Sequence, residues 1–131
     1  MVYPMSLSVY VSTPTSVTPG SEEIAMTAIA VVTTVASRKD ARSLARAIVE
    51  AKLAACAQIS RIESVYSWKG AIEAGKEYRI LFKTLDEHYA AVERAILDLH
   101  PYEVPAIHAF PMMHVAPAYA AWIEESVAVQ G

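Results

Sequence analysis

The sequence contains two long strand-like segments separated by a short turn region, and this pairing constrains the fold more than any other feature. The segments are RIESVYSWKG (61–70) and KEYRILFKTL (76–85), and the turn region contains Gly70 and Gly75. Within 78–83, Tyr, Ile and Phe alternate with Arg, Leu and Lys, which is the period of two of a strand with distinct faces. We therefore expect a β-hairpin whose arms reach beyond the core of one domain.

A strand pattern and a helical pattern precede this hairpin, and a second helical pattern follows it. Residues 27–37 form a β-branched, apolar run that is typical of a strand buried on both faces. Ser37 and Asp40 have the spacing of a capping box, which opens a helix. The apolar stripe of that helix has helical spacing and consists of Ala41, Leu44, Ala45 and Ile48. After the hairpin, Asp86 is expected to N-cap a second helix, which Pro101 ends.

The end of the chain predicts one more strand and one more helix. Residues 104–113 have a strand-like pattern, and Pro105 and Pro111 indicate an edge position or a bulge. Pro117 suits the first turn of a short closing helix. The resulting order, β-α-β-β-α-β plus a C-terminal helix, predicts an α+β fold. We expect a ferredoxin-like sandwich, in which both helices cover one face of an antiparallel sheet.

Composition sets the expected domain organisation and excludes some classes of protein. The chain has 131 residues, which fits one domain, predicted at 26–131. Residues 1–25, rich in Ser, Thr, Val and Pro, are expected to be a flexible N-terminal extension without the pattern of a signal peptide. The net charge of −3 argues against nucleic-acid binding, and no apolar run is long enough for a membrane span. The 54% hydrophobic content favours self-association, and the single Cys56 fits the reducing cytoplasm.

The segment HPYEVPAIHAFPMMH (100–114) contains three of the four histidines and two of the five methionines. His100 is expected at a helix C-terminus, where it can serve as a metal ligand or as a simple cap. Met112 and His114 would share one face of a strand, which suits Cu(I) or plain core packing. His108 is expected to be a satisfied core or interface histidine.

Several other side chains admit both a structural and a functional interpretation. Cys56 has small apolar neighbours, which favours packing over metal binding or redox chemistry. Tyr66, Tyr102 and Glu103 are candidates to line a cleft between subunits with His100, where general acid–base chemistry is possible. The two tryptophans are expected to be core or interface anchors: Trp68 and Trp122.

Five fragments, in this order, resemble the CutA (divalent-cation tolerance) family: AKLAACAQI, SVYSWKG, EYRILFKT, HPYEVP and YAAWI. The resemblance covers about residues 28–127. It implies a homotrimer with the architecture of the PII signalling proteins, in which long hairpins wrap neighbouring subunits. It also implies a role in copper tolerance without enzymatic activity.

The resemblance further implies a metal site, from which this sequence departs. The copper-binding pattern associated with the family uses a cysteine on the first strand and two adjacent histidines before Pro-Tyr. Here the corresponding residues are Thr33 and the pair Leu99–His100, so only His100 carries over as a metal ligand.

We therefore expect a homotrimeric protein that binds copper or another divalent cation weakly and between subunits, with no organic cofactor. Two alternatives stay open. One is a PII-like signalling or scaffold trimer whose intersubunit clefts bind a small anion or a partner through basic residues such as Arg38, Arg42, Lys69 or Arg79. The other is an enzyme that uses Glu103 and His100.

Overall fold

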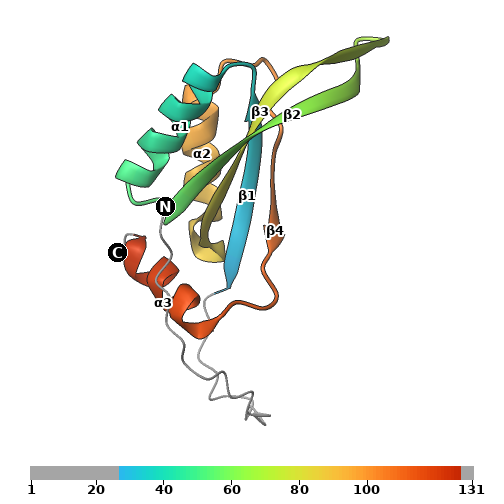
Figure 1. The fold of residues 1–131 in the computed structure, drawn as a ribbon. Helices are drawn as coiled ribbons and strands as arrows, with labels where there is room; N and C mark the ends of the chain where they lie inside the picture. The colour runs from blue at the N-terminus through green and yellow to red at the C-terminus, as the bar shows by residue number, and fades with distance from the viewer. Residues whose placement is uncertain (1–26, 128–131) are drawn as a thin grey trace.

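The computed structural model, which describes residues 27–127, contains the predicted elements in the predicted order (Figure 1). Its strands are β1 (Ala28–Val35), β2 (Cys56–Trp68), β3 (Ala71–Leu85) and β4 (Ile107–Pro111). Its helices are α1 (Arg38–Glu50), α2 (Tyr89–Leu99) and α3 (Pro117–Ser126), and a 3-10 turn, η1 (Asp86–His88), leads into α2. The extension predicted at residues 1–25 lies outside the described residues.

The four strands form one antiparallel sheet in the order β2-β3-β1-β4. β1 lies between β3 and β4, and nearly all of its residues are buried, as its apolar run predicted. β4 is an edge strand, in agreement with its prolines, but it is shorter than the predicted 104–113. Pro105 lies before the strand and Pro111 is its last residue, because a proline cannot donate to a strand ladder.

The β2–β3 hairpin projects well beyond the rest of the sheet (Figure 1). The strands pair from Cys56 opposite Lys83 to Trp68 opposite Ala71. Only Lys69 and Gly70 connect them, with φ angles of 50° and 84°. Two consecutive positive φ angles are typical of the turn whose twist matches that of a hairpin. The turn prediction was wrong for Gly75, which lies within β3 opposite Ser64, because the hairpin already closes at Lys69–Gly70.

The start of α1 follows the sequence prediction, whereas the start of α2 does not. The Ser37 side chain accepts a 3.0 Å hydrogen bond from the Asp40 backbone N–H at the N-terminus of α1. Asp86 was expected to N-cap α2 but is the first residue of η1, and α2 begins three residues later at Tyr89. The physical reason is that the helical segment starts with a tighter 3-10 turn, a common form of a helix N-terminus, so Asp86 is already inside it. The Asp86 backbone N–H donates a 2.8 Å hydrogen bond to the Thr27 carbonyl, which extends the pairing of β1 and β3 up to this turn.

The main core lies between the sheet and the helices α1 and α2, which cover one face of it (Figure 1). Its largest side chains with no exposed surface include Val31, Ile80, Phe82, Val92 and Ile96. A second cluster forms where Ile123 of α3 and Val127 meet Ala28, Ala55 and Leu85. None of the helices in residues 27–127 is both long and apolar enough to cross a membrane.

The residues Cys56, Trp122 and Trp68 have different environments. Cys56 is buried, with its Sγ 3.9 Å from the Tyr119 hydroxyl, which is the packing role predicted for it. Trp122 packs against the second cluster, as expected of a core anchor. Trp68 lies near the hairpin tip and is 37% exposed, so it is no core anchor within this chain.

Candidate functional site

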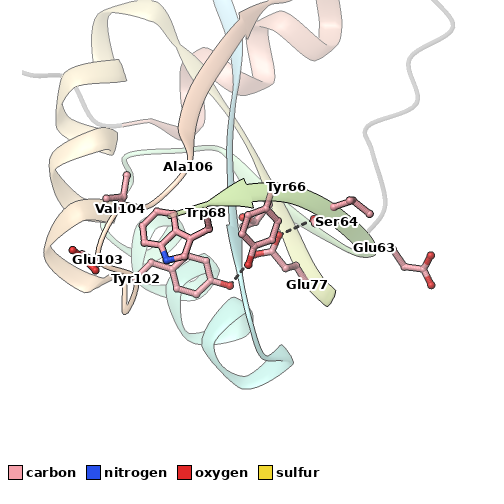
Figure 2. A pocket seen from close by; sticks show the side chains of 11 residues that line it. Glu63, Ser64, Tyr66, Trp68, Glu77, Tyr102, Glu103, Val104 and Ala106 are labelled. Atoms are coloured by element: carbon pink, nitrogen blue, oxygen red, sulfur yellow. Dashed lines mark hydrogen bonds between the residues drawn. The ribbon is translucent and has the colours of Figure 1, made fainter. Parts of the chain in front are cut away.

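A pocket of about 740 Å³ lies between the hairpin and the loop that follows α2 (Figure 2). The hairpin and the loop supply most of its wall, and β1 contributes one residue. The lining residues are Thr34, Glu63, Ser64, Val65, Tyr66, Trp68, Glu77, Tyr102, Glu103, Val104 and Ala106. Tyr66, Tyr102 and Glu103, which were expected to line a cleft between subunits, line this pocket within one chain, whereas His100 is not among its lining residues.

The Glu77 carboxylate is held by two hydrogen bonds inside this pocket (Figure 2). Its Oε1 accepts from the Ser64 hydroxyl at 2.8 Å, and its Oε2 accepts from the Tyr102 hydroxyl at 2.8 Å. Glu77 thus fastens the loop after α2 to both strands of the hairpin, which fixes the position of its negative charge.

The same contact changes the acidity of Tyr102. Burial of the phenol, the hydrogen bond to Glu77 and the negative charge of Glu77 all raise the pKa of Tyr102 well above its ordinary value of 10.0. Tyr102 therefore remains a hydrogen-bond donor far into the alkaline range.

Three aromatic rings line the pocket. Tyr66 and Trp68 are two residues apart on β2 and so point to the same face of that strand. Tyr102 approaches from the loop after α2 (Figure 2). At the rim, Lys69 Nζ lies 5.5 Å from the centroid of the Trp68 ring and 3.9 Å from Glu103 Oε1.

The charged side chains that line the pocket are all acidic: Glu63, Glu77 and Glu103. No lysine, arginine or histidine is among the lining residues. A pocket with this charge attracts cations and repels anions.

His100, the predicted metal ligand, lies beside the pocket, at the C-terminus of α2. Its Nε2 is 2.7 Å from the Thr34 carbonyl oxygen, and its Nδ1 accepts a 3.1 Å hydrogen bond from the Tyr102 backbone N–H. Because Nδ1 accepts, the ring proton is on Nε2 and is donated to Thr34. The ring also packs edge-on against Tyr102, with centroids 4.8 Å apart. Both ring nitrogens are thus engaged within the chain.

The other metal candidates, Met112 and His114, do not gather around His100, and Met112 packs against the second core cluster. His108 was expected in the core or at an interface; it is exposed on β4, where it packs edge-on against Phe110, so it is not a core histidine of this chain. His114 is exposed beyond β4. Within residues 27–127, no group of three His, Cys, Asp or Glu side chains is placed to hold a metal ion. Thr33 is buried with its hydroxyl oxygen unpaired in the described part of the chain.

Sequence reasoning missed Glu77 and Ser64, which organise the pocket. The register of the hairpin contained the missing signal. With the turn at Lys69–Gly70, Ser64 pairs with Gly75, and Glu77 is its diagonal neighbour on β3. Because Gly75 was predicted to lie in the turn, the pairing of Ser64 with β3 could not be predicted.

Comparison with known proteins gives one consistent result. Residues 29–126 match the family model described as CutA1 divalent ion tolerance protein. A probable divalent-cation tolerance protein CutA homolog of Encephalitozoon cuniculi is 37% identical over 98 residues, which are 75% of this chain and 86% of that protein. The divalent-cation tolerance protein CutA of Archaeoglobus fulgidus is 36% identical over 94 residues, which are 72% of this chain and 92% of that protein.

Solved structures agree with this result. The crystal structure of CutA1 from Oryza sativa superposes with a TM-score of 0.77 at 31% identity, over 80% of this chain and 97% of that one. The structure of the periplasmic divalent cation tolerance protein CutA from Archaeoglobus fulgidus superposes with a TM-score of 0.75 at 34% identity. That match covers 77% of this chain and 99% of the Archaeoglobus chain.

Proposed function

The chain belongs to the CutA1 divalent ion tolerance family, and on this premise we propose that it is a homotrimeric protein that binds copper or another divalent cation in the cytoplasm. The family is named for tolerance and not for an enzymatic activity, and we propose a non-catalytic role in the response to metal ions. The family match over residues 29–126 carries this proposal. The strand order β2-β3-β1-β4 supports a ferredoxin-like sandwich as the fold of each subunit.

In this proposal His100 supplies one metal ligand through Nδ1. A metal-bound histidine usually donates its other ring N–H to a carbonyl or carboxylate, which orients the ring. His100 has this arrangement, because its Nε2 contacts the Thr34 carbonyl at 2.7 Å. Metal binding at Nδ1 would replace the hydrogen bond from the Tyr102 backbone N–H.

The described residues of one chain do not form a complete metal site, since no three suitable donors converge. The proposed site is therefore shared between subunits, and binding is weak because each chain contributes few ligands.

The hairpin supports the proposed trimer. It projects beyond the sheet and carries exposed apolar side chains near its tip, including Val65 at 74% and Ile72 at 75% exposure (Figure 1). Such exposed apolar patches mark interaction surfaces, and contact with a neighbouring subunit would bury them.

The alternative of a PII-like trimer that binds a small anion in its clefts is not favoured. The pocket beside the hairpin has acidic and no basic lining residues. Two of the basic residues considered for anion binding lie over aromatic rings instead, Arg38 over Tyr78 and Lys69 over Trp68.

The metal proposal is tested by titrating copper into the wild type, His100→Ala and His108→Ala, followed by calorimetry. We expect His100→Ala to bind copper at least about tenfold more weakly than the wild type. Loss of a hydrogen-bonding partner of a metal ligand already has an effect of this size, and loss of the ligand itself should have no smaller one. His108→Ala is the matched control, because it removes an exposed histidine on β4, and it should bind like the wild type. Absence of binding by the wild type, or equal binding by His100→Ala, would contradict the proposal.

The assembly is tested by light scattering. We expect a mass about three times the 14.3 kDa of the chain. A monomeric mass would exclude the trimer.

A further inference from the structure

We propose that the pocket between the hairpin and the loop after α2 binds an organic cation, in the form of a primary ammonium group on an apolar body. This site uses neither His100 nor a metal ion, so it goes beyond the proposed function.

The aromatic wall is the first support. Tyr66, Trp68 and Tyr102 line the same cavity, and the faces of such rings attract a cation, most strongly the face of tryptophan. Val104 adds apolar surface to the lining. A wall of this composition can bury the apolar body of a ligand beside its charged end.

The second support is a carboxylate with a fixed position. Each carboxylate oxygen of Glu77 already accepts one hydrogen bond: Oε1 accepts from Ser64 and Oε2 accepts from Tyr102. A carboxylate oxygen has a second lone pair, so Glu77 can accept a further hydrogen bond from an ammonium group without losing its anchors. Glu103 adds a second negative charge at the rim.

The third support is an ammonium group of the chain itself. Lys69 Nζ lies 5.5 Å from the centroid of the Trp68 ring and 3.9 Å from Glu103 Oε1. One cation thus already contacts an aromatic ring and a carboxylate of this wall together. The Lys69 side chain is 70% exposed and flexible, so a ligand can displace it.

The same observations argue against other ligand classes. The carboxylates of the pocket belong to no three-donor group suited to a metal ion in the described part of the chain. The lining also lacks any basic side chain that would hold an anion. A cavity of about 740 Å³ has room for a small organic molecule.

The test uses three probes of similar size and shape that differ in charge: benzylammonium, benzyl alcohol and benzoate. The chain has two tryptophans, so fluorotryptophan labelling gives two ¹⁹F resonances, which Trp122→Phe assigns. We expect benzylammonium to shift the Trp68 resonance saturably, and the other two probes to shift it much less at equal concentration. Trp122, which packs against the second core cluster, is the internal control and should not move.

Three variants then test the roles of the charges. Glu77→Gln should weaken benzylammonium binding about fivefold, as expected for loss of one partly exposed charge contact. Glu103→Gln changes an exposed rim residue, so it tests the charge without disturbing the Glu77 anchors, and it should weaken binding less. Lys69→Asn should strengthen binding a few-fold, because it removes the competing ammonium while asparagine tolerates the positive φ of this turn position.

The matched control is Glu124→Gln, an exposed glutamate on α3 outside the pocket, which should bind like the wild type. Equal shifts of Trp68 with benzyl alcohol or benzoate would overturn the proposal. So would the absence of any saturable shift, or unchanged affinity in both Glu77→Gln and Glu103→Gln.

Discussion

The Tyr102 hydroxyl donates a 2.8 Å hydrogen bond to Oε2 of Glu77, and this contact joins the loop after α2 to β3. The other carboxylate oxygen, Oε1, accepts from Ser64 on β2. Three segments that are separate in the sequence therefore meet at one negative charge. The loop after α2 is attached to the hairpin here, beside the pocket that both segments line.

Removing the Tyr102 hydroxyl should weaken this attachment. We expect Tyr102→Phe to lower the free energy of unfolding by about 1 kcal/mol, the typical net value of a hydrogen bond that is not fully buried. Urea unfolding at fixed protein concentration measures this change. Tyr66→Phe is the matched control. It removes a hydroxyl group that belongs to the same pocket but makes no hydrogen bond to the described residues. A loss for Tyr66→Phe as large as that for Tyr102→Phe would contradict this role of the contact.

The raised pKa of Tyr102 predicts a specific loss of stability at alkaline pH. Burial and the Glu77 carboxylate raise the pKa of this phenol in the folded state, whereas the unfolded chain keeps the ordinary value of 10.0. The stabilisation is therefore fully present below pH 10 and is lost as the pH rises above it, because the unfolded state then releases the proton more readily.

Urea unfolding of the wild type and Tyr102→Phe at pH 9, 10 and 11 tests this prediction. The wild type should lose more stability than the variant between pH 10 and 11. Tyr89, whose pKa is also raised by Glu93, is present in both proteins and cancels in the comparison. Parallel pH profiles would show that Tyr102 does not titrate as described.

The elements of the fold were predictable where local patterns determine them. Helix α1 follows from the spacing of Ala41, Leu44, Ala45 and Ile48 and from the Ser37 cap, all of which lie within one segment. The start of α2 was not predictable in this way, because the segment opens with the 3-10 turn Asp86–His88 and has no side-chain cap. The polar residue Asp86 looks the same in the sequence whether it precedes an α-helix or begins a 3-10 turn.

The candidate site was predictable in part for the same reason. The segments that contain Tyr66, Tyr102 and Glu103 were each recognisable, and the structure brings these three residues together. Glu77 was missed because its contact with Ser64 depends on the hairpin register, which a turn of two residues fixes. A turn placed a few residues later would have put different side chains opposite Ser64.

The two glycines near the hairpin tip should respond oppositely to alanine. Gly70 has a φ of +84°, so alanine there should cost about 1 kcal/mol of backbone strain, although nothing lies within 4 Å of the added Cβ. Gly75 lies in β3 with open space around an added Cβ and without a positive φ, so Gly75→Ala should be neutral or stabilise by a few tenths of a kcal/mol. Thermal unfolding of the two variants measures the contrast. Equal melting temperatures would contradict the assignment of the turn to Lys69–Gly70.

The C-terminus of α1 contains a non-glycine residue at a position that favours glycine. Lys52 has a φ of 61°, its N–H bonds to the Val49 carbonyl, and the Leu53 N–H bonds to the Ile48 carbonyl. These two hydrogen bonds form a Schellman motif in which Lys52 occupies the left-handed position.

We expect Lys52→Gly to raise the free energy of unfolding by about 0.5–1 kcal/mol. Relief of the left-handed strain contributes about 1–2 kcal/mol, and the greater freedom of glycine in the unfolded chain offsets about 0.4–1 kcal/mol of it. Lys52→Ala is the matched control, since it removes the same exposed charge but keeps a Cβ at positive φ, and it should not stabilise the protein. Urea unfolding of both variants distinguishes the two effects. A gain for Lys52→Ala equal to that for Lys52→Gly would mean that the charge of Lys52, and not its backbone conformation, limits the stability of this helix end.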